Sequence, residues 1–407
     1  MLSDDAEARL ADLLPRLWEI RRDIHQHPEI GFQEVRTQGL VRTWLQDHGY
    51  HPRESAKTGL IAEIGPTGGG DTPTIALRAD MDCLPMHEET PLPYRSKVPG
   101  MAHKCGHDGH TTILMGVAAM LAAQRDALRG RVRLLFQPSE EGINGSGGHV
   151  MVEEGGLAGV NEVYGLHNWP GYPKGDVRVC AGPTMAQVHS YEITIIGVGG
   201  HGSQPQLCRD PIVAGAHLIT ALQTVVSRGL GYEGGAVLSV GSFHAGEASN
   251  VIPGVAKLNG TIRTFDPAVA ERVLERMHEV CAGIGATFGV EVAPEITAGF
   301  PVLENDAHCA ETVRRVAERV VGPERISDAG LPMAGGEDFA YMARAVPGAY
   351  FFLGAQLPGE NTPVCHHPDF DFDDDLIETG VRMMLGIVAD RVGYSAGRIG
   401  RFDRPRK

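Results

Sequence analysis

Apolar residues recur at helical spacing near the start of the chain. Leu10, Leu14 and Leu17 follow this spacing in one stretch, and a second such stretch surrounds Val41. Because residues three or four positions apart lie on the same face of a helix, the pattern predicts two amphipathic helices between residues 6 and 48. Both helices are expected to pack against an apolar core.

Short apolar runs farther along the chain alternate with a helical stretch. The runs cover residues 74–78, 132–136 and 162–166, and the helical stretch covers residues 110–127. Alternation of short strands with helices is typical of an α/β fold whose sheet is largely parallel and buried. We therefore predict a mainly parallel mixed sheet flanked by helices.

Side chains that can bind metal ions follow each of these apolar runs. Asp80 and Asp82 come after the first run, Glu140 and Glu141 after the second, and His167 directly after the third. Because open α/β sheets bind ligands at the carboxyl ends of their strands, we expect these side chains to meet at one site.

The pattern changes between residues 184 and 299. The expected elements are strand 188–197, a helix that Asp210 and Pro211 open, strands 236–243 and 255–265, helix 267–286 and strand 288–293. This βαββαβ order predicts an inserted α+β domain with a ferredoxin-like fold. From residue 301 the earlier style resumes, with a helix near 307–321, a strand at 349–353 and a helix from about Asp375. Residues 1–183 and 300–407 are therefore predicted to form one discontinuous catalytic, metal-binding domain.

Composition narrows the class of protein and its partners. The 407 residues are 42% apolar and 21% charged, which is typical of a globular protein long enough for two domains. A formal net charge of −15 disfavours nucleic acid and anionic membranes as partners. The chain lacks both an apolar run of about 20 residues and a basic, apolar start, so we expect a cytoplasmic location without membrane contact. Its seven widely spaced cysteines argue against a disulfide framework, and most are expected to be buried thiols.

Two short motifs carry the chemistry that metal sites require. In Cys105-Gly106-His107 a thiol and an imidazole are separated by one small residue, so both can face one ion. The alternative is a buried cysteine beside a loop histidine.

The adjacent Glu140 and Glu141 follow an apolar strand, where a metal would compensate their charge. One carboxylate could then bind metal while the other acts as a general base. The alternative for this pair is an exposed acidic turn.

Histidines in two further segments extend this set. His167 follows a predicted strand, and His366 and His367 precede an acidic stretch at residues 369–375. A single histidine is more often structural than a ligand. Candidate ligands in four separate segments together predict a metal site.

Motifs spread along the whole chain resemble one known family. They are RDIHQHPE (22–29), RADMD (78–82) with Pro85, CGHDGH (105–110), QPSEEG (137–142), GLH (165–167), GGH (199–201) and GGEDF (335–339). The chain resembles the aminoacylase and carboxypeptidase superfamily of dinuclear metallohydrolases. It is most similar to the branch that contains hippurate hydrolase, N-acyl-amino-acid amidohydrolases and auxin-conjugate hydrolases.

The resemblance implies a role for each candidate residue of the predicted metal site. The ligands of two divalent ions, which could be zinc, manganese, cobalt or nickel, would be Cys105, His107, Glu141, His167 and His366, with His367 as the alternative to His366. Glu140 would be the general base toward a metal-activated water. Asp82 would orient a group of the metal site rather than bind the ions itself.

The same resemblance assigns residues of the inserted domain. His201 would donate a hydrogen bond to the reaction's oxyanion from a neighbouring subunit, which implies a homodimer formed through this lid domain. Asn250 and Arg263 would bind the substrate's carboxylate, a task for which an arginine fork is suited. A surface histidine in a glycine-rich turn and an outward-facing strand arginine are the alternatives.

The expected activity is metal-dependent hydrolysis of the amide bond of small N-acyl amino acids. A dipeptidase or carboxypeptidase of the same superfamily is the rival enzyme, but those branches usually carry a carboxylate where this chain has Cys105. A non-catalytic protein that keeps the metal is the second rival, and Glu140 argues against it because a closed structural site needs no general base. Lys104 departs from the family's usual small residue and is expected to face solvent.

Overall fold

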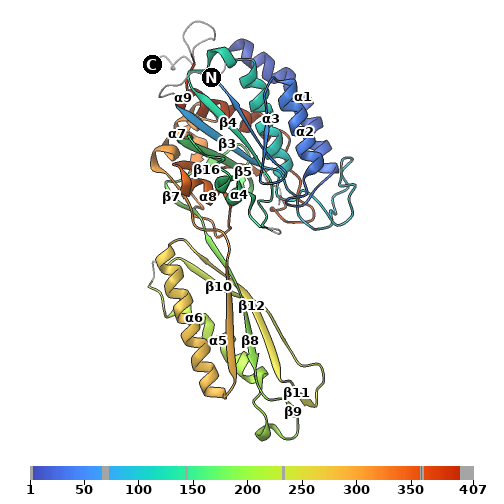
Figure 1. Cartoon of the computed structure of the whole chain (residues 1–407), viewed down its shortest axis with the longest axis vertical. Coiled ribbons are helices and arrows are strands. Elements are labelled where there is room, and N and C mark those ends of the chain that lie inside the picture. Colours follow the sequence, from blue (N-terminus) through green and yellow to red (C-terminus); the bar gives the residue numbers. More distant parts are fainter. Residues whose placement is uncertain are drawn as a thin grey trace. The chain divides into compact units, whose positions relative to one another are not determined.

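The chain divides into two compact units (Figure 1). The computed structural model describes residues 3–66, 73–142, 145–231, 234–357, 359 and 362–394. The first unit consists of Met1–Thr184, Glu304–Leu331 and Asp338–Lys407, and the second of Met185–Leu303 and Pro332–Glu337. The polypeptide therefore leaves the first unit, builds most of the second, returns to the first, and contributes residues 332–337 to the second before it ends in the first.

A twisted eight-stranded sheet forms the centre of the first unit. Its strands follow the order β1-β2-β4-β3-β5-β16-β6-β15. Their bounds are β1 Arg53–Ser55, β2 Gly59–Ile64, β3 Thr74–Asp80, β4 Arg131–Gln137, β5 Glu162–Pro173, β6 Val177–Arg178, β15 Ile326–Ser327 and β16 Gly348–Gln356. The four central strands β4, β3, β5 and β16 run parallel. The prediction of a mainly parallel sheet is therefore confirmed.

Seven helices are described in the first unit. They are α1 Asp4–Gln26, α2 Val35–Asp47, α3 His107–Ala122, α4 Gly147–Glu153, α7 Ala307–Val320, α8 Phe339–Ala345 and α9 Leu376–Arg391. Helix α3 contacts α1, α2 and α9 and is buried along almost its whole length (Figure 1). Gly116 permits this packing, because a Cβ there would lie 2.8 Å from both Leu17 and Val381. The first residues of α3 are thereby fixed beside the ends of the central strands.

The second unit is built on one sheet and two long helices. Its four-stranded antiparallel sheet has the order β10-β12-β8-β13, and α5 and α6 pack on it. The bounds are β8 Gln187–Ile196, α5 Pro211–Ser227, β10 Ala236–Ala245, β12 Val255–Thr264, α6 Pro267–Phe288 and β13 Glu291–Ala298. A short hairpin pairs β9 Gly200–His201 with β11 Val251–Ile252.

Two predicted boundaries were wrong. The strand expected at 288–293 begins only at Glu291, because α6 continues to Phe288 and ends at Gly289, whose φ of 63° suits a glycine. His167 does not follow a strand but lies inside β5, which continues to Pro173 because it pairs with β16.

Short elements complete the description. The remaining strands, β7 Gly182–Met185 and β14 Leu303–Asn305, form a two-stranded sheet, and three 3-10 helices cover Arg125–Ala127, Pro205–Leu207 and Pro323–Arg325. All seven cysteines are free thiols, and five of them are buried. Among the described helices, none combines the length and the apolar character that a membrane crossing requires.

Candidate metal centre

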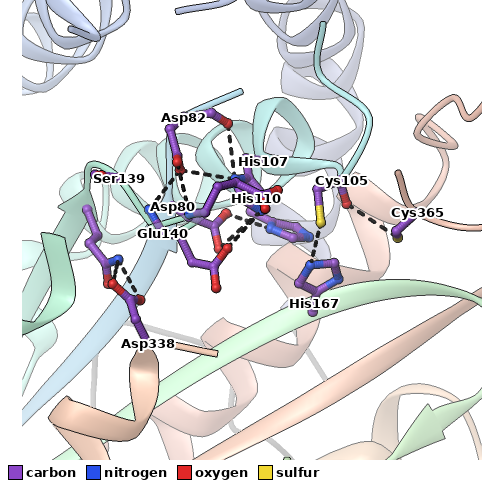
Figure 2. Close-up of polar contacts among 12 residues, drawn as sticks. Asp80, Asp82, Cys105, His107, His110, Ser139, Glu140, His167, Asp338 and Cys365 are labelled. Carbon is purple, nitrogen blue, oxygen red and sulfur yellow. Dashed lines mark hydrogen bonds and ion pairs between the residues drawn. The ribbon is translucent and has the colours of Figure 1, made fainter. Parts of the chain in front are cut away.

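The loop before α3 brings a thiol and two imidazoles together. Cys105 Sγ lies 3.3 Å from His167 Nε2, and His107 is the first residue of α3 (Figure 2). Between them, Gly106 has a φ of 105°, and a Cβ there would lie 2.0 Å from Asn168 Oδ1. Only glycine fits this position, so the sequence of the loop determines how closely Cys105 and His107 approach β5.

Asp82 connects the histidine of this loop with the glutamate pair. His107 Nδ1 lies 3.0 Å from the Asp82 carbonyl oxygen and 3.2 Å from its Oδ1 (Figure 2). The Asp82 carboxylate also accepts hydrogen bonds from the backbone N–H groups of Glu140 and Glu141, both at 3.0 Å. One buried side chain thus fixes both segments, although they lie far apart in the sequence.

The two glutamates turn their carboxylates toward the histidines. His107 Nε2 lies 3.7 Å from Glu140 Oε2 and 4.0 Å from Glu141 Oε1. His366 Nε2 lies 3.3 Å from the same Glu141 oxygen. Glu141 therefore faces histidines from two segments that are more than 200 residues apart.

The side chains at this site fit divalent cations. Their possible ligand atoms lie within 4.8 Å of one another in three overlapping groups, which are Cys105-His107-His167, His107-Glu140-Glu141 and Cys105-Glu141-His366. Within the described part of the chain, His107 Nε2 and Glu141 Oε1 are buried atoms that have no hydrogen-bond partner. Since buried polar atoms without partners are costly, a cation between such atoms would remove the cost. Thiol, imidazole and carboxylate together form a set suited to zinc and similar metals.

Electrostatics at the site favour an additional positive charge. The pKa of the Cys105 thiol lies well above its ordinary value. A hydrogen bond with Cys365 is the main cause, and burial and the charge of Glu141 add to it. Burial lowers the pKa of His107, but the negative charges of Asp80, Asp82 and Glu141 outweigh it and raise that pKa well above its usual range. A bound cation would stabilise the thiolate and the neutral imidazole, which are the ligating forms.

A buried network of polar side chains supports the histidines from behind. His110 Nδ1 lies 2.7 Å from Asp80 Oδ1, and its Nε2 lies 2.7 Å from Asn168 Oδ1. Arg78 donates a hydrogen bond of 2.6 Å to the other Asp80 oxygen. Burial raises the pKa of Asp80, but the charges of His107, His110 and Arg78 outweigh it and hold the pKa well below its usual range. The network keeps Asp80 charged beside the candidate ligands.

His110 lies in the CGHDGH motif and is a supporting residue, but it was not predicted as one of the metal ligands. The available signal was its spacing, because residues three positions apart share a helix face and His107 begins the helix.

The expectation that the Lys104 side chain faces solvent was wrong. It is fully buried, and its ammonium group donates to Glu88 Oε1 at 2.8 Å, Thr90 Oγ1 at 3.1 Å and the Phe370 carbonyl at 2.7 Å. Three acceptors satisfy its three protons, and the Glu88 carboxylate neutralises its charge. Lys104 thus ties the loop before Cys105 to two other segments.

The structure separates the two neighbouring histidines near residue 366. The backbone N–H of His366 donates to the Lys104 carbonyl at 2.6 Å, and its side chain faces Glu141. His367 Nδ1 instead accepts a hydrogen bond from the Asp369 backbone N–H at 3.1 Å. His366 therefore joins the cluster and His367 does not.

Three predicted site residues belong to the second unit. His201 is exposed, and its Nδ1 accepts a hydrogen bond from the Ser203 backbone N–H at 3.1 Å. Asn250 is also exposed and lies beside it, because the Asn250 carbonyl accepts the Gly202 N–H at 2.8 Å. Arg263 is half-buried near the far end of β12, eight residues beyond Val255, which corresponds to about 26 Å of strand. The second unit therefore does not bring Arg263 to His201 and Asn250.

Comparisons with known proteins agree with this site. The sequence matches the family described as Peptidase family M20/M25/M40 over residues 76–390. N-acetylcysteine deacetylase of Bacillus subtilis is 40% identical over 364 residues, which cover 89% of this chain and 93% of that protein. Hippurate hydrolase of Campylobacter jejuni is 36% identical over 371 residues, or 90% and 94% of the two chains. The crystal structure of a dinuclear metal binding M20 peptidase of Bacillus subtilis superposes with a TM-score of 0.79 at 36% identity, covering 93% and 98%.

Proposed function

Because the chain belongs to peptidase family M20/M25/M40, we propose that it is a metal-dependent amidohydrolase that cleaves the amide bond of N-acyl amino acids. Relatives named N-acetylcysteine deacetylase and hippurate hydrolase support this substrate class. The observation that carries the proposal is the position of Glu140. Its carboxylate lies next to a buried set of ligand atoms, two of which have no hydrogen-bond partner among the described residues.

In this proposal Cys105, His107, Glu141, His167 and His366 hold two divalent ions. Zinc, manganese, cobalt and nickel all suit this mixture of sulfur, nitrogen and oxygen ligands. Such ions would polarise the substrate's carbonyl group and lower the pKa of a water molecule. The Nδ1–H group of His107 donates to the Asp82 carbonyl, so its Nε2 presents a lone pair to the site.

Glu140 moves the proton. Its Oε2 lies 3.7 Å from His107 Nε2, and the carboxylate is almost completely buried. In the first step Glu140 accepts a proton from the attacking water, and in the second it gives that proton to the departing amine. The hydrogen bond from its backbone N–H to Asp82 holds the residue in place for both transfers.

The second unit supplies the remaining groups in this account, with the chain acting as a homodimer. His201 would stabilise the oxyanion of a partner subunit, and Asn250 and Arg263 would bind the substrate's carboxylate. His201 and Asn250 lie near Val255, at one end of the sheet. Arg263 lies about 26 Å farther along β12, toward the other end. One copy of the chain therefore could not bind a single carboxylate with both Asn250 and Arg263. Two copies of the chain can provide them together.

Apolar side chains near His201 also favour a partner surface. The exposed large apolar residues at that end of the second unit include Ile196, Val198, Leu207, Val251 and Val255. Exposed apolar side chains that cluster in this way are typical of protein interfaces. A second copy of the chain is the occupant that completes the proposed active site.

A substrate screen coupled to metal analysis tests the proposal. The apoprotein would be loaded with zinc, manganese, cobalt or nickel and assayed on N-acetyl, N-benzoyl and longer N-acyl amino acids and on dipeptides. We expect about two ions per subunit and hydrolysis of at least one N-acyl series in preference to dipeptides. A preference for dipeptides would favour the peptidase alternative, and metal binding without hydrolysis would favour a binding protein.

A further inference from the structure

Three consecutive backbone N–H groups around Glu140 donate to two buried carboxylates. The N–H groups of Glu140 and Glu141 donate to Asp82, both at 3.0 Å. The preceding N–H group, that of Ser139, donates to Glu34 Oε1 at 2.9 Å. Glu34 lies at the start of α2, more than 100 residues from Ser139, and is fully buried. The backbone that carries Glu140 is thus fixed from both sides.

Ser139 needs such support because its backbone is strained. Its φ is 50°, in the left-handed region that residues with a Cβ seldom adopt, and its side chain is fully buried. Conformations of this kind persist only where the surroundings hold them in place. The Ser139 hydroxyl donates to the Gly145 carbonyl at 2.6 Å, and the Ser139 carbonyl accepts the Gly147 N–H at 3.0 Å. The remaining backbone polar group of Ser139, its N–H, donates a hydrogen bond to Glu34.

The segment before α2 is shaped to fit against Ser139. A Cβ at Gly31 would lie 2.3 Å from the Ser139 hydroxyl oxygen, so this glycine allows the close approach. Glu34 is itself fixed by a hydrogen bond between the Thr58 hydroxyl and its Oε2. Glu34 Oε1 is thereby directed at the Ser139 N–H, while Oε2 is directed at Thr58.

We infer that Glu34 is a positioning residue, whose carboxyl group holds the Ser139 N–H and so fixes the direction in which Glu140 leaves the backbone. This inference rests on the proposed function, in which Glu140 transfers the proton. A general base must be held close to its optimum, since a displacement of about 1 Å can reduce turnover roughly 100-fold. Glu34 acts through Ser139 and does not touch the substrate.

The test separates position from charge with two variants of similar size. Glu34→Gln keeps the reach of the side chain, and its amide oxygen can still accept the Ser139 N–H while its NH2 group donates to Thr58. Glu34→Asp keeps the charge but withdraws the acceptor by one methylene. In the metal-loaded full chain, we expect Glu34→Gln to keep kcat within about 3-fold, and Glu34→Asp and Glu34→Ala to lower it about 30- to 100-fold with KM nearly unchanged.

Glu29 provides a matched control in the same segment. Its carboxylate accepts the N–H groups of Arg36 at 2.9 Å and Thr37 at 2.8 Å, at the start of α2, and not that of Ser139. Glu29→Ala should therefore keep kcat within about 3-fold, because it disturbs only the helix start. A loss of kcat in Glu29→Ala as large as that in Glu34→Ala would overturn the inference, as would equal loss in Glu34→Gln and Glu34→Asp.

Hydrogen exchange gives a readout that does not depend on activity. The Ser139 amide should exchange at least about 10-fold faster in Glu34→Asp than in wild type, and at the wild-type rate in Glu34→Gln and Glu29→Ala. Unchanged exchange in Glu34→Asp would overturn the role of Glu34 even if the wild-type enzyme is active. If wild type hydrolyses no N-acyl amino acid, the proposed function fails, and the exchange result alone decides whether Glu34 positions Ser139.

Discussion

His107 Nδ1 lies 3.0 Å from the backbone carbonyl oxygen of Asp82. This contact places a proton on Nδ1, so that Nε2 is the nitrogen left to bind a metal ion beside the glutamate carboxylates. The same aspartate accepts the backbone N–H groups of the two glutamates. The orientation of a candidate ligand and that of the candidate base therefore depend on one residue.

Asp82→Ala should weaken metal binding without removing a ligand. Loss of its carboxylate removes the Oδ1 contact with His107, although the carbonyl contact remains, and leaves the N–H groups of Glu140 and Glu141 unpaired. We therefore expect metal affinity to fall about 10- to 100-fold. Competition with a chelator of known affinity measures this directly. Cys83→Ala is the matched control, because it changes the adjacent buried side chain but no candidate ligand. Equal metal affinity in Asp82→Ala and wild type would contradict the orienting role.

His366→Ala and His367→Ala should differ in metal content. Both side chains are about half exposed, at 54% and 50%, so neither change should unfold the protein. Only His366 faces Glu141, and we therefore expect His366→Ala to lose bound metal while His367→Ala keeps about two ions per subunit. Elemental analysis after dialysis gives the answer. Loss of metal from His367→Ala alone would assign the ligand to His367 instead.

Glu34 should make stability depend on pH. Burial raises its pKa from 4.5 to about 7, and the charge of Asp82 adds to this, although hydrogen bonds from Thr58 and Ser139 oppose it. Because the folded pKa exceeds the unfolded one, the stabilising contribution is complete below pH 4.5 and is lost as the pH rises through about 7.

Glu34→Gln removes this dependence because its side chain stays neutral. Relative to Glu34→Gln, the wild-type free energy of unfolding should fall by roughly 2 kcal/mol between about pH 5 and about pH 8. Urea unfolding of both proteins, with a chelator present to exclude metal binding, measures the difference. Parallel pH profiles for the two proteins would show that Glu34 does not titrate in this range.

Mixing two inactive variants tests whether His201 acts on a partner subunit. His201→Ala and Glu140→Ala should each be inactive, but a mixed dimer contains one site with both residues intact if His201 is donated in trans. After complete subunit exchange, about one quarter of wild-type activity should return, because half of the dimers are mixed and each has one working site. No recovery despite demonstrated exchange would show that His201 does not act across the dimer.

Local pattern predicted much of the fold, and the reasons for its failures are physical. Short apolar runs indicated the strands β3, β4 and β16, because most of their residues are buried. The two-residue strands β6 and β15 are too short to produce a pattern. The start predicted for the strand at 288–293 was wrong, because α6 continues to Phe288. Gly289 was a visible signal of this boundary, since a glycine after a helical run marks the helix end.

The candidate site was predictable where its residues follow strands or lie in short motifs. Cys105, His107, Glu140 and Glu141 belong to such segments, and the structure brings them together. The roles of Lys104 and Glu34 were not predictable, because they depend on contacts between distant segments. The burial of Lys104 depends on acceptors as distant as Phe370, and the role inferred for Glu34 depends on Ser139.

Glu140→Gln tests the central claim most directly, through bound metal and turnover measured on the same sample. The amide is nearly isosteric with the carboxylate but cannot accept the proton. The account predicts that the variant keeps the wild-type metal content while kcat for an N-acyl amino acid falls at least about 100-fold. Near-normal turnover with a full complement of metal would contradict the assignment of Glu140 as the general base.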